Sequence, residues 1–253
     1  ATSFDVAFFR RMGGIVLQYH QVVKGRFLRR PNRFIASARL SDSGVSVVCH
    51  VKNTGRCREL LLPGSQLVLE HHPDALKKGR KTEYSLICVY KERAGFSGQT
   101  LLINMDSQAP NQAAYEWLAN GGFGPVCHLQ REVKFGNSRF DLSFQKDGTL
   151  YFMEVKGVTL EQKGTASFPD APTERGLKHL LELQEAAREG YGAAVLFVIQ
   201  MKDIRSFTPN RHTHPAFADA LKEVSKHGVQ ILAKDCIVTE HSMTIDQDVP
   251  VIL

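Results

Sequence analysis

The sequence contains no long apolar segment and no paired cysteine motif. Among its 253 residues, no apolar run approaches the roughly 18 residues that a membrane-spanning helix needs. The five cysteines are odd in number and never spaced as C-x-x-C, which argues against a disulfide framework or a cysteine zinc site. The start also lacks a basic segment followed by a sustained apolar core, as a secretory signal would have. We therefore expect a cytoplasmic protein with reduced thiols and no membrane contact.

Charge is distributed unevenly along the chain, although the formal net charge is only +6. Residues 1–95 contain 17 Lys and Arg against 7 Asp and Glu, a net of +10. Residues 96–253 contain 15 against 19, a net of −4. This division is typical of a module that binds a polyanion joined to a module rich in carboxylates. A solvated basic surface would produce the same excess, so charge alone does not decide the function.

Residues 23–95 are predicted to form a small β-barrel of the oligonucleotide-binding (OB) type. About five short β-like runs lie between Gly25 and Tyr90, separated by turn residues, and that number suits a small barrel. Phe27 and Phe34 are interleaved with the basic residues, and we interpret both as core residues in preference to base-stacking platforms. The arginines expected to contact nucleic acid are Arg26, Arg29, Arg30, Arg33, Arg56 and Arg58.

Residues 96–253 are predicted to form a mixed-sheet α/β domain, so the fold class is α/β overall with an N-terminal barrel. Helical and strand-like patterns alternate in this part, which implies a right-handed crossover. Residues 1–22 are assigned to an extension or an expression remnant. The expected elements of the α/β domain are helices at 111–120, 173–190 and 215–227, and strands at 126–134, 138–144, 150–156, 193–199 and 229–233.

The chemistry is concentrated in one hairpin. Asp147-Gly148 is a strong signal for a two-residue turn. Counting outward from that turn places Asp141 directly opposite Glu154, and alternation puts Lys156 on the same face as Glu154. The opposite face should then be apolar, with Phe140, Leu142, Phe144, Tyr151, Met153 and Val155.

Two carboxylates opposed across a hairpin repel each other, and a divalent cation between them relieves that repulsion. Mg²⁺ or Mn²⁺ accepts hard oxygen ligands, keeps several waters and leaves positions open for a phosphate oxygen. We therefore expect Asp141 and Glu154 to be metal ligands. Lys156 would position an attacking water or neutralise charge on the phosphate. The competing interpretation is a surface charge pair beside a salt-bridging lysine.

These residues resemble the PD-(D/E)xK nuclease superfamily, in which an Asp precedes the hairpin turn and Glu-x-Lys follows it. Asp141, Glu154 and Lys156 match the motif, whereas Phe140 stands where the motif has Pro. The resemblance implies a metal-dependent phosphodiesterase with a core of helix, three-stranded meander, helix and strand.

Many members of that superfamily contribute a further acid from the preceding helix. Glu116 occupies that place in the predicted helix at 111–120. Glu132 is the alternative, because a turn at residues 136–137 would set it opposite Asp141. Glu116 is preferred, and Glu132 remains open.

A closer resemblance, to the sugar fermentation stimulation protein A family, covers about residues 24–245. It implies an N-terminal OB barrel, a PD-(D/E)xK domain, and nuclease or nucleic-acid-binding activity toward DNA or RNA. The family name records a sugar-utilisation phenotype and implies no sugar chemistry. The matching stretches are residues 50–55 (HVKNTG), 62–64 (LPG), 135–141 (FGNSRFD), 154–159 (EVKGVT) and 168–180 (FPDAPTERGLKHL).

The start of the helix at 173–190 is a second candidate for phosphate contact. Thr173 is a plausible N-cap, and Arg175 and Lys178 lie in the first turns, where a helix favours anions. Two functions follow from these patterns. The first is a Mg²⁺- or Mn²⁺-dependent nuclease acting on DNA, RNA or both. The alternative is a nucleic-acid-binding regulatory protein of sugar metabolism on a catalytically weak or inactive nuclease scaffold. The sequence does not predict the oligomeric state.

Overall fold

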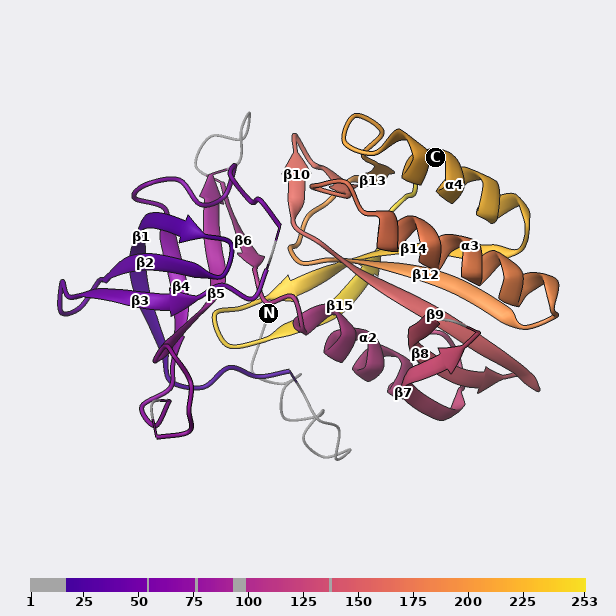
Figure 1. The fold of residues 1–253 in the computed structure, drawn as a ribbon, viewed down its shortest axis with the longest axis horizontal. Helices are drawn as coiled ribbons and strands as arrows, with labels where there is room; N and C mark the ends of the chain where they lie inside the picture. The colour runs from indigo at the N-terminus through magenta and orange to yellow at the C-terminus, as the bar shows by residue number, and fades with distance from the viewer. Residues whose placement is uncertain (1–16, 54, 76, 93–98, 137) are drawn as a thin grey trace.

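The protein has two lobes, a β-barrel and an α/β domain, which lie side by side (Figure 1). The predicted fold class is thereby confirmed. Within the part that the structure describes, no helix is long and apolar enough to span a membrane. Most of the predicted extension at residues 1–22 lies outside the described residues. The computed structural model describes residues 17–53, 55–75, 77–92, 99–136 and 138–253.

The barrel is closed by a pairing between strands that are not neighbours in the sequence. The sheet order is β3-β2-β1-β4-β5-β6, and β3 pairs with β5 as well as with β2. This closes the first five strands into a barrel, as predicted. The strands are β1 (Val22–Asn32), β2 (Ile35–Leu40), β3 (Ser46–His50), β4 (Gln66–His71), β5 (Tyr84–Glu92) and β6 (Thr100–Asn104).

Alternation along β2 explains how the barrel wall fits together. Ala36 and Ala38 are fully buried, whereas Arg39 is exposed, as expected for a strand with one face toward the interior. Phe27 pairs with Ala38 and is buried, so a large side chain packs next to a small one. The strand β6 follows the boundary proposed at residue 95 and pairs with β5. The first sheet therefore extends beyond that boundary.

The α/β domain is built on a mixed six-stranded sheet with the order β15-β14-β12-β9-β8-β7. The predicted helices and strands are all present within two residues of their expected bounds, apart from the strand expected to end at residue 233, which β14 continues to Val238. Parallel pairing of β12 with both β9 and β14 confirms the predicted crossover pattern. The elements are α2 (Ala109–Ala119), β7 (Cys127–Phe135), β8 (Ser138–Lys146), β9 (Thr149–Val158), α3 (Glu174–Arg188), β12 (Gly192–Ile199), α4 (Pro215–Lys226), β14 (Val229–Val238) and β15 (Met243–Asp248).

Four strands of the α/β domain had no counterpart in the sequence prediction. One is β15, which pairs with β14 at the edge of the main sheet. The others are β10 (Leu160–Gln162), β11 (Thr165–Phe168) and β13 (Ser206–Pro209), which form a separate three-stranded sheet. These three strands have only three or four residues each, too few for an alternating pattern to be recognised.

Helices cover both faces of the main sheet (Figure 1). The helices α3 and α4 contact each other on one face, where Leu180, Leu183 and Phe217 join the larger apolar cluster. The helix α2 covers the other face through Ala113, Ala114 and Leu118. Because β12 lies between these layers, its apolar run is buried on both sides.

Polar contacts fasten the barrel to the α/β domain. Lys91 Nζ of β5 lies 2.6 Å from Glu161 Oε2 of β10, and both side chains are largely buried. The amide of Arg56 donates to Asp170 Oδ2 at 3.1 Å. A Cβ atom at Gly55 would stand 2.2 Å from that same carboxylate oxygen, so a larger residue there would displace the Asp170 carboxylate. The loop after β3 is therefore held against the segment that leads into α3.

Candidate active site

The hairpin of β8 and β9 has the predicted register. All five recorded residue pairs follow the count from the turn, and they end at Leu142 opposite Met153. Asp147 and Gly148 both have positive φ, 50° and 78°, as the central residues of a type I′ turn do. Local turn chemistry therefore fixed the alignment that the site depends on.

Asp141 lies on β8, one residue beyond the last of these pairs, and the predicted pairing of Asp141 with Glu154 is not among them. Its Oδ2 atom accepts a hydrogen bond from the backbone amide of Val155 at 2.8 Å. Its Oδ1 atom accepts from Asn111 Nδ2 of α2 at 2.7 Å. The carboxylate is therefore held directly beside the residue that follows Glu154, and it faces the start of α2.

The apolar face predicted for this hairpin is correct except at Phe140. Leu142, Phe144, Met153 and Val155 are buried in the cluster beneath α2. Phe140 instead packs against Phe135 and Phe152 in the cluster on the α3 side. The strand leaves regular alternation at Asp141, where the side chain bonds to the opposite backbone. A count from the turn cannot anticipate that irregularity.

Glu154 is buried on the α3 side of the sheet, with a relative exposure of 3%. Its Oε1 atom lies 2.5 Å from Lys156 Nζ and also receives a hydrogen bond from His179 Nδ1 of α3. Its Oε2 atom is buried and has no hydrogen-bond partner among the described residues. Buried charged oxygens are normally paired, so an open buried oxygen at this position points to a ligand.

The two carboxylates have opposite pKa shifts. Burial and the nearby charge of Glu154 raise the pKa of Asp141 to about 6. Burial alone would also raise the pKa of Glu154, but the His179 hydrogen bond and the Lys156 charge outweigh it and lower that pKa. The first proton taken up by the pair therefore resides on Asp141. The contribution of the Glu154 charge to the raised pKa of Asp141 agrees with two acids close enough to repel each other.

The donor set at this site fits a hard divalent cation. It offers an open, buried carboxylate oxygen on Glu154 and a second carboxylate on Asp141 whose ionised form is penalised. Within the described ranges, no group of three or more His, Cys, Asp or Glu side chains is arranged to hold a metal. Mg²⁺ is nevertheless commonly held by one or two carboxylates, with water and substrate phosphate completing its shell. Asp141 and Glu154 are the residues that would hold it.

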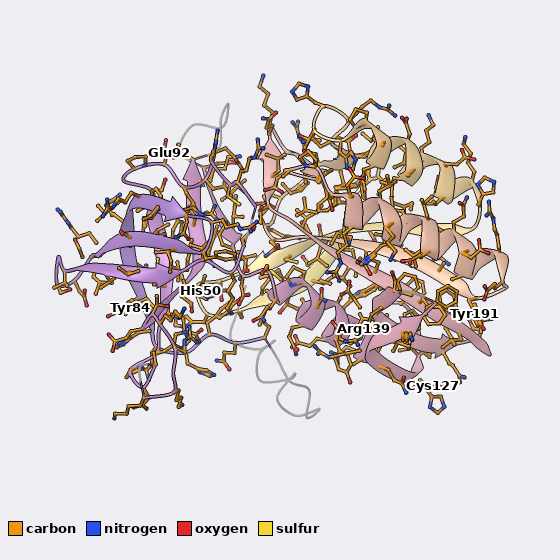
Figure 2. The ribbon with its side chains drawn as sticks, viewed as in Figure 1. His50, Tyr84, Glu92, Cys127, Arg139 and Tyr191 are labelled. Atoms are coloured by element: carbon orange, nitrogen blue, oxygen red, sulfur yellow. The ribbon has the colours of Figure 1, made fainter. Side chains whose placement is uncertain are left out.

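Glu132 lies away from this centre. Its side chain is 61% exposed and lies 3.7 Å from Arg139 Nη1, a residue labelled in Figure 2. The φ angle of Glu132 is 55°, and the recorded pairing of β7 with β8 skips Glu132 and Asp141. The register set by the turn at residues 136–137 is as predicted, although residue 137 lies outside the described residues. The irregular backbone directs the Glu132 carboxylate toward solvent.

Glu116 is half-buried on α2, and its carboxylate accepts a hydrogen bond from Gln112 Nε2 at 2.6 Å. Burial raises its pKa despite that hydrogen bond. In the described part of the chain, no recorded hydrogen bond or ion pair joins Glu116 to Asp141 or to Glu154. The residue of α2 that reaches the site is Asn111, which the sequence prediction did not include.

The helix α3 contributes a residue that was also missing from the predicted site, His179. Thr173 caps this helix as predicted, with its side chain accepting from the Gly176 amide at 3.0 Å. Arg175 and Lys178 are exposed in the first turns, whereas His179 is buried beneath them. The spacing of His179 with Leu180 and Leu183 places it on the buried stripe, and a polar residue on such a stripe is the available signal.

Among the barrel arginines, Arg30 differs because its side chain makes four hydrogen bonds to the backbone of the barrel. Its guanidinium donates to the backbone oxygens of Arg33, Asn53, Gly55 and Arg56 at 2.7 to 3.0 Å. These hydrogen bonds hold the loop after β3 and occupy the donors that a phosphate would use. The remaining barrel arginines of the predicted set are exposed, namely Arg26, Arg29, Arg33, Arg56 and Arg58.

The two phenylalanines of the barrel differ in exposure. Phe27 is buried, as predicted, whereas Phe34 is 45% exposed at the turn between β1 and β2. The guanidinium of Arg33 lies 5.0 Å from the centre of the Phe34 ring. The prediction that Phe34 is a core residue is therefore wrong, because the β1–β2 turn carries it out of the barrel wall. An exposed aromatic ring beside arginines is suited to stacking on a base.

The fold and the site together define a class of protein, an OB-type barrel joined to an α/β domain with a carboxylate pair on its central hairpin. A family model described as the SfsA N-terminal OB domain matches residues 28–103. A second, described as the sugar fermentation stimulation protein RE domain, matches residues 108–242. The chain belongs to the sugar fermentation stimulation protein family, as its resemblance predicted.

Individual relatives match nearly the whole chain. A sugar fermentation stimulation protein homolog of Desulfitobacterium hafniense is 52% identical over 227 residues, covering 90% of this chain and 94% of the relative. A homolog from Clostridium beijerinckii is 46% identical over 238 residues, covering 94% and 100%. The solved structure of Pyrococcus furiosus SfsA in complex with Ca²⁺ superposes with a TM-score of 0.80 at 25% identity, covering 95% of this chain and 100% of that one.

Proposed function

We propose that this protein is a divalent-metal-dependent nuclease that hydrolyses phosphodiester bonds in DNA or RNA. The observation that carries the proposal is the open, buried oxygen of Glu154 beside Asp141. The ionised form of Asp141 is penalised by burial and by the charge of Glu154, and a bound cation removes that penalty. The solved relative from Pyrococcus furiosus was obtained with Ca²⁺, another hard divalent cation, which supports the same choice of ligand.

The side chains around this centre suit phosphodiester hydrolysis. Asp141 and Glu154 would hold Mg²⁺ or Mn²⁺, and such an ion neutralises phosphate charge and lowers the pKa of a bound water. Lys156 is 15% exposed and cationic, so it can stabilise the charge that develops on the phosphate oxygens. The oxygen of a water molecule would form a bond to phosphorus while the bond from phosphorus to the leaving oxygen breaks. The water would give up one proton and the leaving oxygen would take one up. Arg175 and Lys178 are exposed on α3 and would bind flanking phosphates.

The barrel is proposed to hold the nucleic acid. Its exposed arginines and Phe34 offer phosphate contacts and a stacking surface. The loop after β3 links this surface to the α/β domain through the Arg56 amide and Asp170. Nucleic acid held on the barrel would therefore stay close to the segment that leads into α3.

The test is incubation of purified protein with labelled single- and double-stranded DNA and RNA, with Mg²⁺, with Mn²⁺ and with excess chelator. We expect cleavage of at least one substrate with metal and none with chelator. Glu154→Ala should abolish cleavage, because it removes the open oxygen.

Glu132→Gln serves as the matched control. It also changes an acid near β8, but the Glu132 carboxylate lies in solvent beside Arg139. We expect this variant to cleave at the wild-type rate. Full cleavage by wild-type protein in chelator, or by Glu154→Ala, would refute the metal-nuclease proposal. Metal-independent binding without any cleavage would favour a nucleic-acid-binding regulatory protein instead.

A further inference from the structure

The two oxygens of the Glu154 carboxylate have unequal surroundings. Oε1 receives two donors, Lys156 Nζ at 2.5 Å and His179 Nδ1, whereas Oε2 is buried without a partner among the described residues. A carboxylate free to rotate could share its donors between both oxygens. Here one donor comes from its own strand and the other from α3. Their combined effect is to direct Oε2 away from both donors.

His179 is built into the fold more firmly than Lys156. Its side chain is 6% exposed, and it lies on the face of α3 that packs on the sheet, next to Leu180. Lys156 has a long, flexible side chain that is 15% exposed. A lysine ammonium can move toward a phosphate, whereas a buried imidazole on a packed helix stays in place.

We propose that His179 is a positioning residue that fixes Glu154 in the orientation that presents Oε2 to the metal. It donates from Nδ1 to Oε1 and thereby keeps the carboxylate anchored when Lys156 turns toward the substrate phosphate. Glu154 then retains a partner on Oε1 throughout. This inference rests on the proposed function, since the metal gives Oε2 its role.

A purely structural role for His179 predicts different behaviour. In that case, removing the imidazole would lower stability but leave the metal affinity of the folded protein unchanged. Outer hydrogen bonds that orient metal ligands typically contribute 10- to 100-fold in metal affinity. The affinity of folded variants for Mn²⁺ therefore separates the two roles.

The experiment compares full-length wild type with His179→Ala, His179→Asn and His179→Gln. The Asn side chain can place an amide donor near the position of Nδ1, whereas Gln carries its donor one methylene further out. Each protein is checked for folding by circular dichroism and titrated calorimetrically with Mn²⁺, and kcat and KM are measured on a cleaved substrate. We expect His179→Ala to bind Mn²⁺ about tenfold more weakly or worse, and to lose kcat more than KM. His179→Asn should recover most of the affinity, and His179→Gln less.

Each result bears on the inference. Wild-type Mn²⁺ affinity in folded His179→Ala, or equal affinity in the Asn and Gln variants, would overturn it. If the alanine variant does not fold, the comparison of Asn with Gln decides. Wild-type protein that binds Mn²⁺ but cleaves nothing would refute the proposed nuclease function. The Mn²⁺ affinities of the His179 variants would still test the positioning role. A wild type that binds no Mn²⁺ would overturn the positioning role, whether or not it cleaves.

Discussion

Asp141 combines favourable hydrogen bonds with an unfavourable charge. An ordinary aspartate loses its proton near pH 3.8, whereas folding raises the pKa of Asp141 to about 6 through burial and the charge of Glu154. Between these values the folded state binds more protons than the unfolded state. The free energy of unfolding therefore falls as pH rises through this window, and it stays lower above it. Ionised Asp141 is thus a source of instability in the metal-free protein.

Asp141→Asn should remove the fall in the free energy of unfolding that accompanies ionisation of Asp141. The amide can still accept from the Val155 amide, and the Asn111 side chain can rotate to pair with it, so little hydrogen bonding is lost. We expect the variant to gain about 2 to 3 kcal/mol relative to wild type on going from about pH 4 to about pH 7.5. Urea denaturation of both proteins in chelator at these two pH values measures the gain. A difference between them that is independent of pH would contradict the raised pKa.

Variants of the three motif residues should respond differently to Mg²⁺. Mg²⁺ at about 100 times its dissociation constant should stabilise wild type by about 2.7 kcal/mol. Lys156→Ala should keep this response, because an ammonium is not a metal ligand, yet it should lose cleavage. Asp141→Asn and Glu154→Ala should lose both. Thermal melting with and without Mg²⁺ provides the measurement, and loss of the Mg²⁺ response in Lys156→Ala would argue against the assigned roles.

At the scale of the element, we expect the arginines of the β1–β2 hairpin to have two different roles, contact with nucleic acid and stabilisation of the barrel. Arg29 and Arg33 are exposed, whereas Arg30 donates to four backbone oxygens. Arg29→Ala and Arg33→Ala should each weaken nucleic-acid binding and reduce the salt slope by about one unit for each lost phosphate contact. Arg30→Ala should instead lower the free energy of unfolding by about 2 kcal/mol.

Fluorescence anisotropy with labelled oligonucleotides at several salt concentrations, beside urea denaturation, distinguishes these outcomes. Phe34→Ala should weaken binding to single strands without changing the salt slope, since stacking involves no counterion release. A salt slope untouched by loss of both exposed arginines would show that the hairpin does not carry the substrate.

At the scale of the whole molecule, ion pairs fix how the two lobes meet. Lys52 Nζ, just after β3, lies 2.5 Å from Asp106 Oδ2 in the connection between β6 and α2, and the Asp106 side chain is 3% exposed. Lys52→Met would leave a buried carboxylate without its cation. We expect a loss of about 3 kcal/mol in the free energy of unfolding.

Lys77→Met is the matched control for that measurement, because Lys77 pairs with Asp74 at 3.2 Å where both side chains are exposed. Its loss should change stability by less than about 0.5 kcal/mol. The double variant Lys52→Met with Asp106→Asn should recover part of the loss, since it removes the stranded charge. Equal effects of the two single lysine variants would show that the connection is not held by this ion pair.

Much of the fold could be predicted from the sequence because short-range rules determine it. The Asp147-Gly148 turn and strand alternation set the hairpin register, and Thr173 marked the start of α3. Apolar periodicity indicated the main helices and strands. The short strands of the three-stranded sheet were not predicted, because three or four residues form a strand only when other parts of the chain supply its partners.

The sequence by itself determined the hairpin register from the turn out to Leu142 opposite Met153, since a single turn controls that alignment. The tertiary structure decided the rest of the site. His179 and Asn111 reach Glu154 and Asp141 from helices packed on opposite faces of the sheet, and Phe140 changes faces at an irregularity. The use of Arg30 to hold the loop after β3 likewise depends on contacts between distant segments of the barrel. Local chemistry fixes neighbours along a hairpin, whereas contacts between distant segments depend on how complete layers pack.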